Sequence, residues 1–161
     1  YLELAETKSL PRVASIQNAY NLVNRGFEIG LSEVAMHEQV GLLAYSPLAQ
    51  GTLTGKYLGG QMPQGSRLAL FGDGPLMMRY KGDKTQQAIE MYVNLAKKYE
   101  IDPAQLAIQF CNIQPFVTST IIGATTMEQL KTCIDSVDLD ITKEIMNEIR
   151  SIHKEIPNPA P

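Results

Sequence analysis

VTSTIIGATTMEQL, residues 117–130, runs from a β-branched segment through Gly123 directly into a helix start. The β-branched residues of 117–122 predict a buried strand, because such side chains pack well on a pleated surface. Thr125-Thr126-Met127-Glu128 has the pattern of a capping box, which predicts that a helix begins there. A strand that passes straight into a helix is typical of an α/β fold.

Two earlier segments predict further strands. Residues 13–17 follow the helix breaker Pro11 and end in polar residues, and residues 42–45 form a short apolar run closed by Ser46-Pro47. A helix is expected over 32–39, ending before Gly41. The strands predicted at 13–17, 42–45 and 117–122 are therefore separated by helical segments.

Three later helices complete the pattern. We expect Thr85 to cap one, Asp102-Pro103 to open another, and Thr142 to cap the last, which carries Ile145, Ile149 and Ile152 on one face. Alternating strands and helices predict parallel, adjacent strands joined by right-handed crossovers, apolar on both faces because helices cover the sheet. The sequence thus predicts one α/β domain over 1–161, with a long, flexible loop at 58–84 where no helical or strand period is sustained.

Composition excludes several classes of protein. With 44% hydrophobic and 19% charged residues, the chain of 161 residues has globular composition. A net charge of −3 with scattered lysines and arginines argues against nucleic acid as a partner. No apolar run approaches the length of a membrane span, and no signal-peptide pattern opens the chain. We therefore expect a soluble, cytoplasmic protein with no membrane partner, whose Cys111 and Cys133 are reduced.

The first residues suggest that something precedes them. Residues 1–6 contain good helix formers without a capping residue ahead of them, and no methionine opens the chain. We expect a missing upstream segment.

Polar residues follow each predicted strand: Gln17-Asn18, Tyr45-Ser46, and Gly123 to Thr126. In parallel α/β folds, ligands bind at this edge, because loops and helix N-termini converge there. The sequence alone also allows a plainer interpretation, in which Gln17 orders a loop and Tyr45 belongs to the core.

At these strand ends the sequence resembles the aldo-keto reductase family. The resemblance rests on Gln17, on YSPLAQGTLTGKY at 45–57 and on IGATTMEQL at 122–130, and it covers nearly the whole chain. It is nearest to the branch of Tas-like reductases and potassium-channel β-subunits. It implies the C-terminal part of a (β/α)8 TIM barrel, with about three parallel strands and covering helices.

The resemblance also implies NADP(H) as cofactor and assigns the residues that bind it. Gln17 would hydrogen-bond the nicotinamide carboxamide, and Tyr45 would stack on the ring. The pyrophosphate would lie along the loop after Tyr45, held by cationic side chains, and the adenosine 2′-phosphate would lie at the helix start that follows Ile122. The residues assigned to these two groups are Ser46, Pro47, Leu48, Gln50, Lys56 and Arg67 for the first, and Gly123, Thr125 and Gln129 for the second. Thr132 and Cys133 stand where the family has acidic and amide residues.

The implied reaction is reduction of an aldehyde or ketone by NADPH, with a small carbonyl compound as substrate of the full-length parent. The family's catalytic tetrad of tyrosine, lysine, histidine and aspartate lies on earlier strands, so we expect this chain alone to be inactive.

His37 and His153 are expected at the surface, and residues 51–57 do not match a P-loop, since Tyr57 replaces its Ser or Thr. The alternative is a noncatalytic cofactor-sensing or interaction module. A partial barrel should self-associate or pair with the missing half.

Overall fold

A computed structural model describes residues 1–72 and 74–161 of the chain. Its strands are Ser15–Ala19 (β1), Gly41–Tyr45 (β2) and Val117–Thr120 (β3). The α-helices are Leu2–Lys8 (α1), Leu31–His37 (α2), Arg67–Phe71 (α3), Pro75–Met78 (α4), Asp83–Lys98 (α5), Pro103–Asn112 (α6), Met127–Asp135 (α7) and Lys143–Glu155 (α8). Short 3-10 helices occupy Gly26–Glu28 (η1), Ala49–Thr54 (η2), Leu58–Gly60 (η3) and Ser136–Asp138 (η4).

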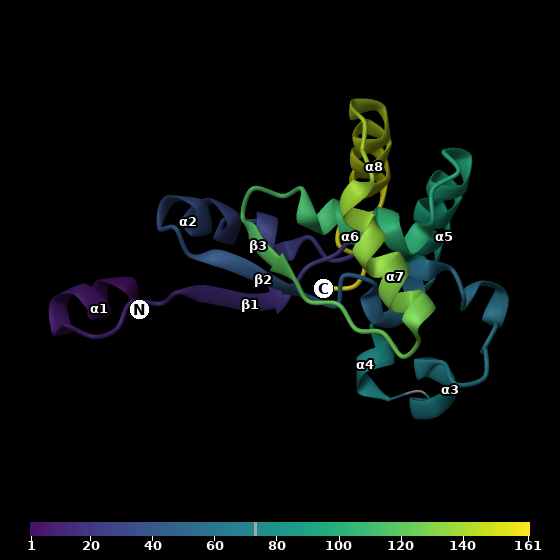
Figure 1. Ribbon diagram of the computed structural model, residues 1–161, viewed down its shortest axis with the longest axis horizontal. Coiled ribbons are helices and arrows are strands. Elements are labelled where there is room, and N and C mark those ends of the chain that lie inside the picture. The colour runs from purple at the N-terminus through teal and green to yellow at the C-terminus, as the bar shows by residue number, and fades with distance from the viewer. Residues whose placement is uncertain (73) are drawn as a thin grey trace.

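The three strands form one parallel sheet in the order β1-β2-β3, which confirms the predicted α/β fold. Their carboxyl ends all point toward the region that holds α3, α4 and α7, while α1 and α2 lie at the opposite end (Figure 1). The fold therefore gathers the loops that follow the strands at one edge of the sheet.

Pairing with β2 sets the bounds of the outer strands. Residues 15–19 pair with the whole of β2, so the first strand lies two residues later than the predicted 13–17. The third strand ends at Thr120 instead of residue 122. The last hydrogen bond to β2 runs from the Ile121 N–H to the Ala44 carbonyl at 2.8 Å, and β2 itself ends at Tyr45, before the left-handed Ser46. Strand length follows here from the partner strand, which composition does not reveal.

The prediction that the strands are apolar on both faces was wrong for the outer two. Leu42 and Ala44 of β2 are fully buried, whereas Gln17 of β1 and Ser119 of β3 are exposed. The central strand has a neighbour on either side, whereas the described chain covers β1 and β3 only in part.

Two of the three predicted helix caps are confirmed. The Asp102 carboxylate accepts from the N–H groups of Ala104 and Gln105 at the start of α6, and the Thr142 hydroxyl accepts from Ile145 at the start of α8. Thr85 was a wrong assignment: α5 begins at Asp83, and the Thr85 hydroxyl donates to the Pro159 carbonyl at 2.8 Å. It joins the first turn of α5 to the C-terminal tail.

The core lies between the sheet and helices α5, α6 and α8. Tyr20, which directly follows β1, stacks on Phe110 of α6 with 5.7 Å between ring centroids and meets Phe116 edge-on at 5.3 Å. Ile145, Ile149 and Ile152 of α8 are buried against this core, as their spacing predicts. No helix among the described residues is long and apolar enough to cross a membrane.

Residues 58–84 are not one continuous loop. They contain η3, α3 and α4, and α5 begins within them at Asp83. Ser66 caps α3 by accepting from the Ala69 N–H at 3.3 Å. Residue 73 of this segment lies outside the described residues. Helices this short give little hydrophobic periodicity, which explains why the pattern predicted none.

Candidate functional site

The turn after β2 forms the centre of the candidate site. Tyr45 ends the strand with 40% of its side chain surface exposed, and Ser46 then adopts a left-handed backbone with φ 55°. The Ser46 carbonyl accepts from the Ala49 N–H at 2.9 Å and from the Asn21 side-chain amide at 3.0 Å. Two contacts thus fix a conformation that residues other than glycine rarely adopt.

Left-handed backbone recurs along the next residues. Ala49, Gln50 and Gly51 have φ values of 48°, 60° and 90°. The Gln50 amide donates to the Ser46 hydroxyl at 3.2 Å, and its Oε1 is buried without a hydrogen-bond partner among the described residues. Non-glycine residues in this region cost about 1–3 kcal/mol each and cluster at ligand clamps. The buried acceptor and the strained backbone both mark this turn as a candidate binding loop.

Lys56 folds back over this loop. A Cβ atom at Gly51 would lie 3.0 Å from both Cε and Nζ of Lys56, so the absence of a side chain at Gly51 gives the ammonium group its place. Nζ lies 5.2 Å from the centroid of the Tyr57 ring, and the Tyr57 hydroxyl accepts from the Leu68 N–H at 3.4 Å. This last contact ties the loop to α3, which begins with the exposed Arg67.

An open hollow of about 320 Å³ follows β3. It is lined by residues 122–127 and Leu130. Thr126 caps α7 by accepting from the Gln129 N–H at 3.2 Å, and Gln129 Oε1 accepts from the N–H and the hydroxyl of Thr125 at 3.0 and 3.1 Å. The predicted box of Thr125 to Glu128 is therefore shifted by one residue, because the third helical position after the cap is Gln129.

The remaining predicted residues are placed differently. Gln17 lies within β1 opposite Leu43, two residues before the strand ends, and is exposed. Pro47 is buried, and Leu48 packs against the core. The structure thus groups Ser46 with Gln50, and Thr125 with Gln129, while the side chains of Gln17 and Arg67 make no hydrogen bond to other described residues.

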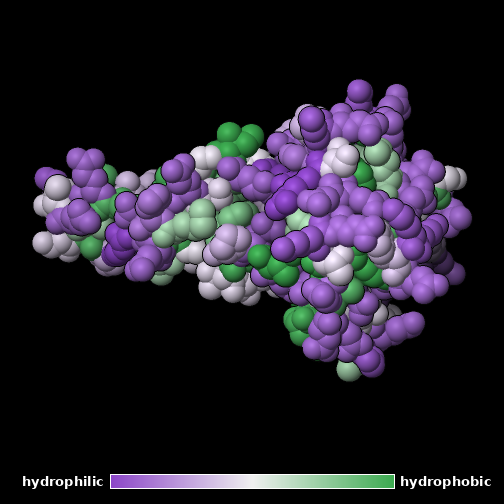
Figure 2. All heavy atoms as spheres, turned by 90° about the horizontal axis from the view of Figure 1, so that it is seen from above, coloured by the Kyte–Doolittle hydropathy of each residue, from purple (hydrophilic) through white to green (hydrophobic). Residues whose placement is uncertain are grey.

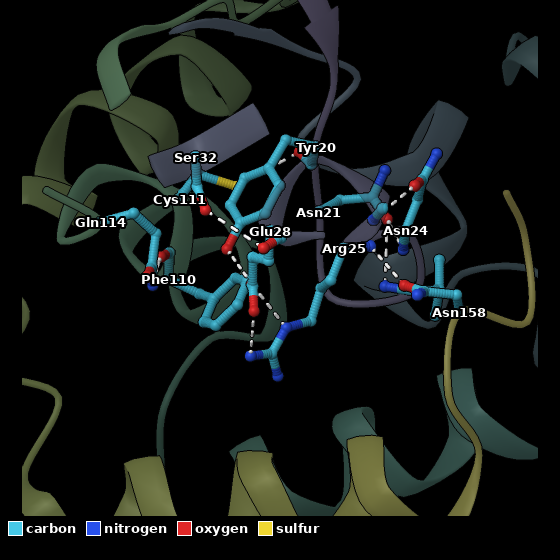
Figure 3. A network of polar contacts seen from close by, with 12 residues as sticks. Tyr20, Asn21, Asn24, Arg25, Glu28, Ser32, Phe110, Cys111, Gln114 and Asn158 are labelled. Carbon is cyan, nitrogen blue, oxygen red and sulfur yellow. Dashed lines mark hydrogen bonds and ion pairs between the residues drawn. The ribbon is translucent and has the colours of Figure 1, made fainter. Parts of the chain in front are cut away.

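A buried polar network below the turn was not predicted. Glu28 accepts from the Tyr20 hydroxyl at 2.6 Å and from two nitrogens of Arg25 at 2.7 and 2.8 Å (Figure 3). Arg25 also lies 5.2 Å above the Phe110 ring. Burial alone would raise the pKa of Glu28, but the hydrogen bonds from Arg25 and Tyr20 outweigh it and hold this pKa below its ordinary value of 4.5. The signal in the sequence was an arginine and a glutamate three residues apart just after a strand.

Tyr80 was also missed. It lies between α4 and α5 with 3% of its surface exposed. Burial, together with the nearby Tyr45 phenol, raises the pKa of Tyr80 against the opposing charge of Arg79.

The two histidines differ in their surroundings. The His37 side chain is 78% exposed on α2, as predicted. His153 was wrongly expected at the surface: it is half-buried on α8, because that face of the helix packs near Arg25 and Glu28. Burial and then the Arg25 charge lower the pKa of His153, against the opposing effect of Glu28.

The chain matches one protein family along nearly its whole length. The sequence model described as "Aldo/keto reductase family" matches residues 1–154. Protein Tas of Escherichia coli K12 is 50% identical over 161 residues, covering 100% of this chain and 46% of that protein. A probable voltage-gated potassium channel subunit beta of Oryza sativa subsp. japonica is 36% identical over 115 residues, covering 70% of this chain and 35% of that protein.

The solved structure of a glycerol dehydrogenase from Gluconobacter oxydans has the same fold. The TM-score is 0.68 at 22% identity, over 94% of this chain and 45% of that one. The chain spans about half the length of protein Tas and of this dehydrogenase, and 35% of the potassium channel subunit.

Proposed function

Since the chain belongs to the aldo/keto reductase family, we propose that it forms the NADP(H)-binding wall of a cytoplasmic reductase of aldehydes and ketones. The observation that carries the proposal is the turn at 46–51, left-handed at Ser46, Ala49, Gln50 and Gly51, with the Lys56 ammonium group folded over Gly51. A cation held above an open stretch of backbone suits the pyrophosphate of a dinucleotide.

Tyr45 and Gln17 would hold the nicotinamide end. The exposed face of Tyr45 offers a flat surface on which an aromatic ring can stack. Gln17 carries an exposed amide on the neighbouring strand, two positions before Ala19, the register partner of Tyr45. An amide matches the donor and acceptor of a carboxamide and would orient the ring.

The pyrophosphate would lie along the turn. Ser46 and Gln50 present polar side chains there, with Pro47 and Leu48 packed beneath as support. Arg67 would join Lys56 there, a role supported by the hydrogen bond from the Leu68 N–H to the Tyr57 hydroxyl, which ties α3 to the loop. Two cations fit the two negative charges of this group.

The adenosine 2′-phosphate would lie in the hollow after β3. Gly123 is open, with no atom within 4 Å of where its Cβ would stand, and the N-terminus of α7 offers free N–H groups and a positive dipole. Thr125 and Gln129 flank this position. Cys133 is buried and is not among the residues that line the hollow that the phosphate would occupy.

The chemistry would need a proton donor from outside this chain. NADPH, when bound, supplies a hydride to the carbonyl carbon, and the carbonyl oxygen then takes a proton. His37 is exposed on α2 at the opposite end of the strands, and His153 lies on α8 beside Arg25. We therefore propose that this chain orients the cofactor and that a tetrad in the other half of the barrel acts as the acid.

The edges of the sheet support an assembly. Within the described residues, β1 and β3 each have a strand partner on one side only. Figure 2 shows hydrophobic atoms among hydrophilic ones along the narrow end of the molecule. On and next to α2, Ile29, Leu31, Val34 and Met36 are exposed. We propose that these surfaces pair with the rest of a barrel or, in its absence, with a second copy.

A noncatalytic cofactor-sensing or interaction module is the second candidate. It is favoured by the relative described as a potassium channel subunit. Both candidate functions include cofactor binding by this chain. They differ in whether the chain, together with its assembly partner, reduces a carbonyl compound.

Lys56→Ala is expected to weaken NADPH binding by about 1.5–3 kcal/mol, which is the range for a hydrogen bond to a charged group. Fluorescence titration of NADPH against the wild type and the variant measures this loss. Lys154→Ala, which removes an exposed lysine near the end of α8, is the matched control and should bind as the wild type does. Equal affinities for wild type and Lys56→Ala would remove Lys56 from the site.

A further inference from the structure

Asn21 is a wholly buried amide with an orientation fixed by its own turn. Its side chain has 0% exposure. Its Oδ1 accepts from the N–H groups of Val23 and Asn24 at 3.0 and 2.9 Å. A backbone bridge between Asn21 and Asn24 closes the same turn. Because two N–H donors fix the oxygen, the amide nitrogen can point in only one direction.

That nitrogen points at the candidate site. Asn21 Nδ2 donates to the Ser46 carbonyl at 3.0 Å, across a separation of 25 residues. The preceding residue does the same for the preceding carbonyl, since the Tyr20 N–H donates to Tyr45 O at 3.3 Å. Residues that follow β1 thus hold the last residue of β2 and the first residue of the turn after it.

The hydrogen bond from Asn21 to Ser46 stabilises a turn whose backbone is strained. Ser46 is left-handed at φ 55°, and its carbonyl receives hydrogen bonds from Asn21 and from Ala49. Such a conformation persists only where its surroundings determine it. Among the described residues, Asn21 is the one side chain that donates to the Ser46 carbonyl; without it, only the Ala49 N–H remains as a donor there.

We propose that Asn21 is a positioning residue for the nicotinamide end of the cofactor: its amide sets the Ser46 peptide and thereby the direction of the Tyr45 ring and the Ser46 hydroxyl. The inference rests on the proposed function. Asn21 does not itself touch the cofactor; it acts through Ser46.

Asn21→Asp separates the two roles of the side chain. The new carboxyl accepts from the N–H groups of Val23 and Asn24, and these hydrogen bonds favour its ionised form against the effect of burial, so we expect it to be ionised at about pH 8. One oxygen still accepts from Val23 and Asn24, while the other faces the Ser46 carbonyl as a second acceptor and repels it. The Asn21 turn is retained, and the turn after β2 must shift.

The test is titration of two probes against the full 161-residue chain. NADPH spans both ends of the site, whereas adenosine 2′-monophosphate carries neither the nicotinamide nor the pyrophosphate and would use only the end near Thr125 and Gln129. We expect Asn21→Asp to raise the dissociation constant of NADPH about tenfold and to change that of adenosine 2′-monophosphate less than about twofold. A merely structural defect would weaken both probes alike.

Asn24→Asp is the matched control, since the Asn24 side chain accepts within its own turn, from the Gly26 N–H at 3.3 Å. It should leave both affinities unchanged. Should Asn21→Asp fail to fold, Asn21→Ser keeps a hydroxyl acceptor for the turn but removes the amide nitrogen that reaches the Ser46 carbonyl, and it should shift NADPH affinity in the same direction. If the affinity for NADPH is unchanged, or if the affinities for both probes fall equally, the proposed role of Asn21 is overturned, while the proposed function is not affected. A wild-type chain that binds neither probe overturns the proposed function as well.

Discussion

NADPH oxidation by this chain, with a broad panel of aldehydes, is expected to be about 10²–10⁴-fold slower than with a full-length family member, which is the range for losing general acid catalysis. The chain would orient the cofactor, but the carbonyl oxygen would meet no positioned proton donor. His153 is half-buried, with burial and Arg25 holding its pKa down, and His37 projects into solvent.

The same preparation should show association in light scattering, with a mass above that of one chain even at low concentration. The partly unpaired β1 and β3 give a physical reason for this expectation. Adding the other half of a family barrel should restore activity if that half supplies the tetrad. A monomer that reduces aldehydes at ordinary enzymatic rates would contradict the division of labour proposed above.

Glu28→Ala is expected to lower the free energy of unfolding by about 3 kcal/mol at neutral pH, at the low end of the range for breaking a buried ion pair. The Arg25 side chain is 12% exposed and the Glu28 side chain 28% exposed, so removing the carboxylate leaves a guanidinium with little access to water. The Tyr20 hydroxyl loses its acceptor at the same time. Urea unfolding followed by circular dichroism measures the loss.

The stabilisation by Glu28 should depend on pH in one direction. Its pKa in the folded chain lies below the ordinary value of 4.5, so the unfolded chain binds the proton first as the pH falls. The contribution is therefore complete above about pH 5 and is lost as the pH falls through the folded pKa. The difference in free energy of unfolding between the wild type and Glu28→Ala should decrease as the pH falls toward about 3.

Two variants control this experiment. Glu33→Ala removes a 76% exposed carboxylate on the neighbouring helix and should change stability by less than about 0.5 kcal/mol. Glu28→Gln keeps the shape and should lie between wild type and Glu28→Ala. If Glu28→Ala and Glu33→Ala have the same free energy of unfolding, the network of Tyr20, Arg25 and Glu28 does not stabilise the fold.

The elements that sequence predicted well are those with a local signal. The order of strands and helices follows from turn residues and periodicity, and Asp102 and Thr142 cap their helices through contacts only two or three residues away. The segments 45–57 and 122–130 were identified because their side-chain chemistry matches a family, and the structure places them after two neighbouring parallel strands.

What sequence missed depends on contacts between distant segments. Thr85 looks like a cap, but its hydroxyl bonds to Pro159, 74 residues away. His153 looks like a surface residue until Arg25 and Glu28 come near it. Asn21 reads as one more polar residue after a strand, and its role appears only with its contact to Ser46. Local patterns carry no information about these partners.

A crystal structure of the chain soaked with NADP⁺ tests the central claim most directly. The account predicts the nicotinamide against Tyr45 within reach of Gln17, the pyrophosphate along residues 46–51 beneath Lys56, and the 2′-phosphate beside Thr125 and Gln129. A dinucleotide bound elsewhere, or bound with its two ends exchanged, would contradict it.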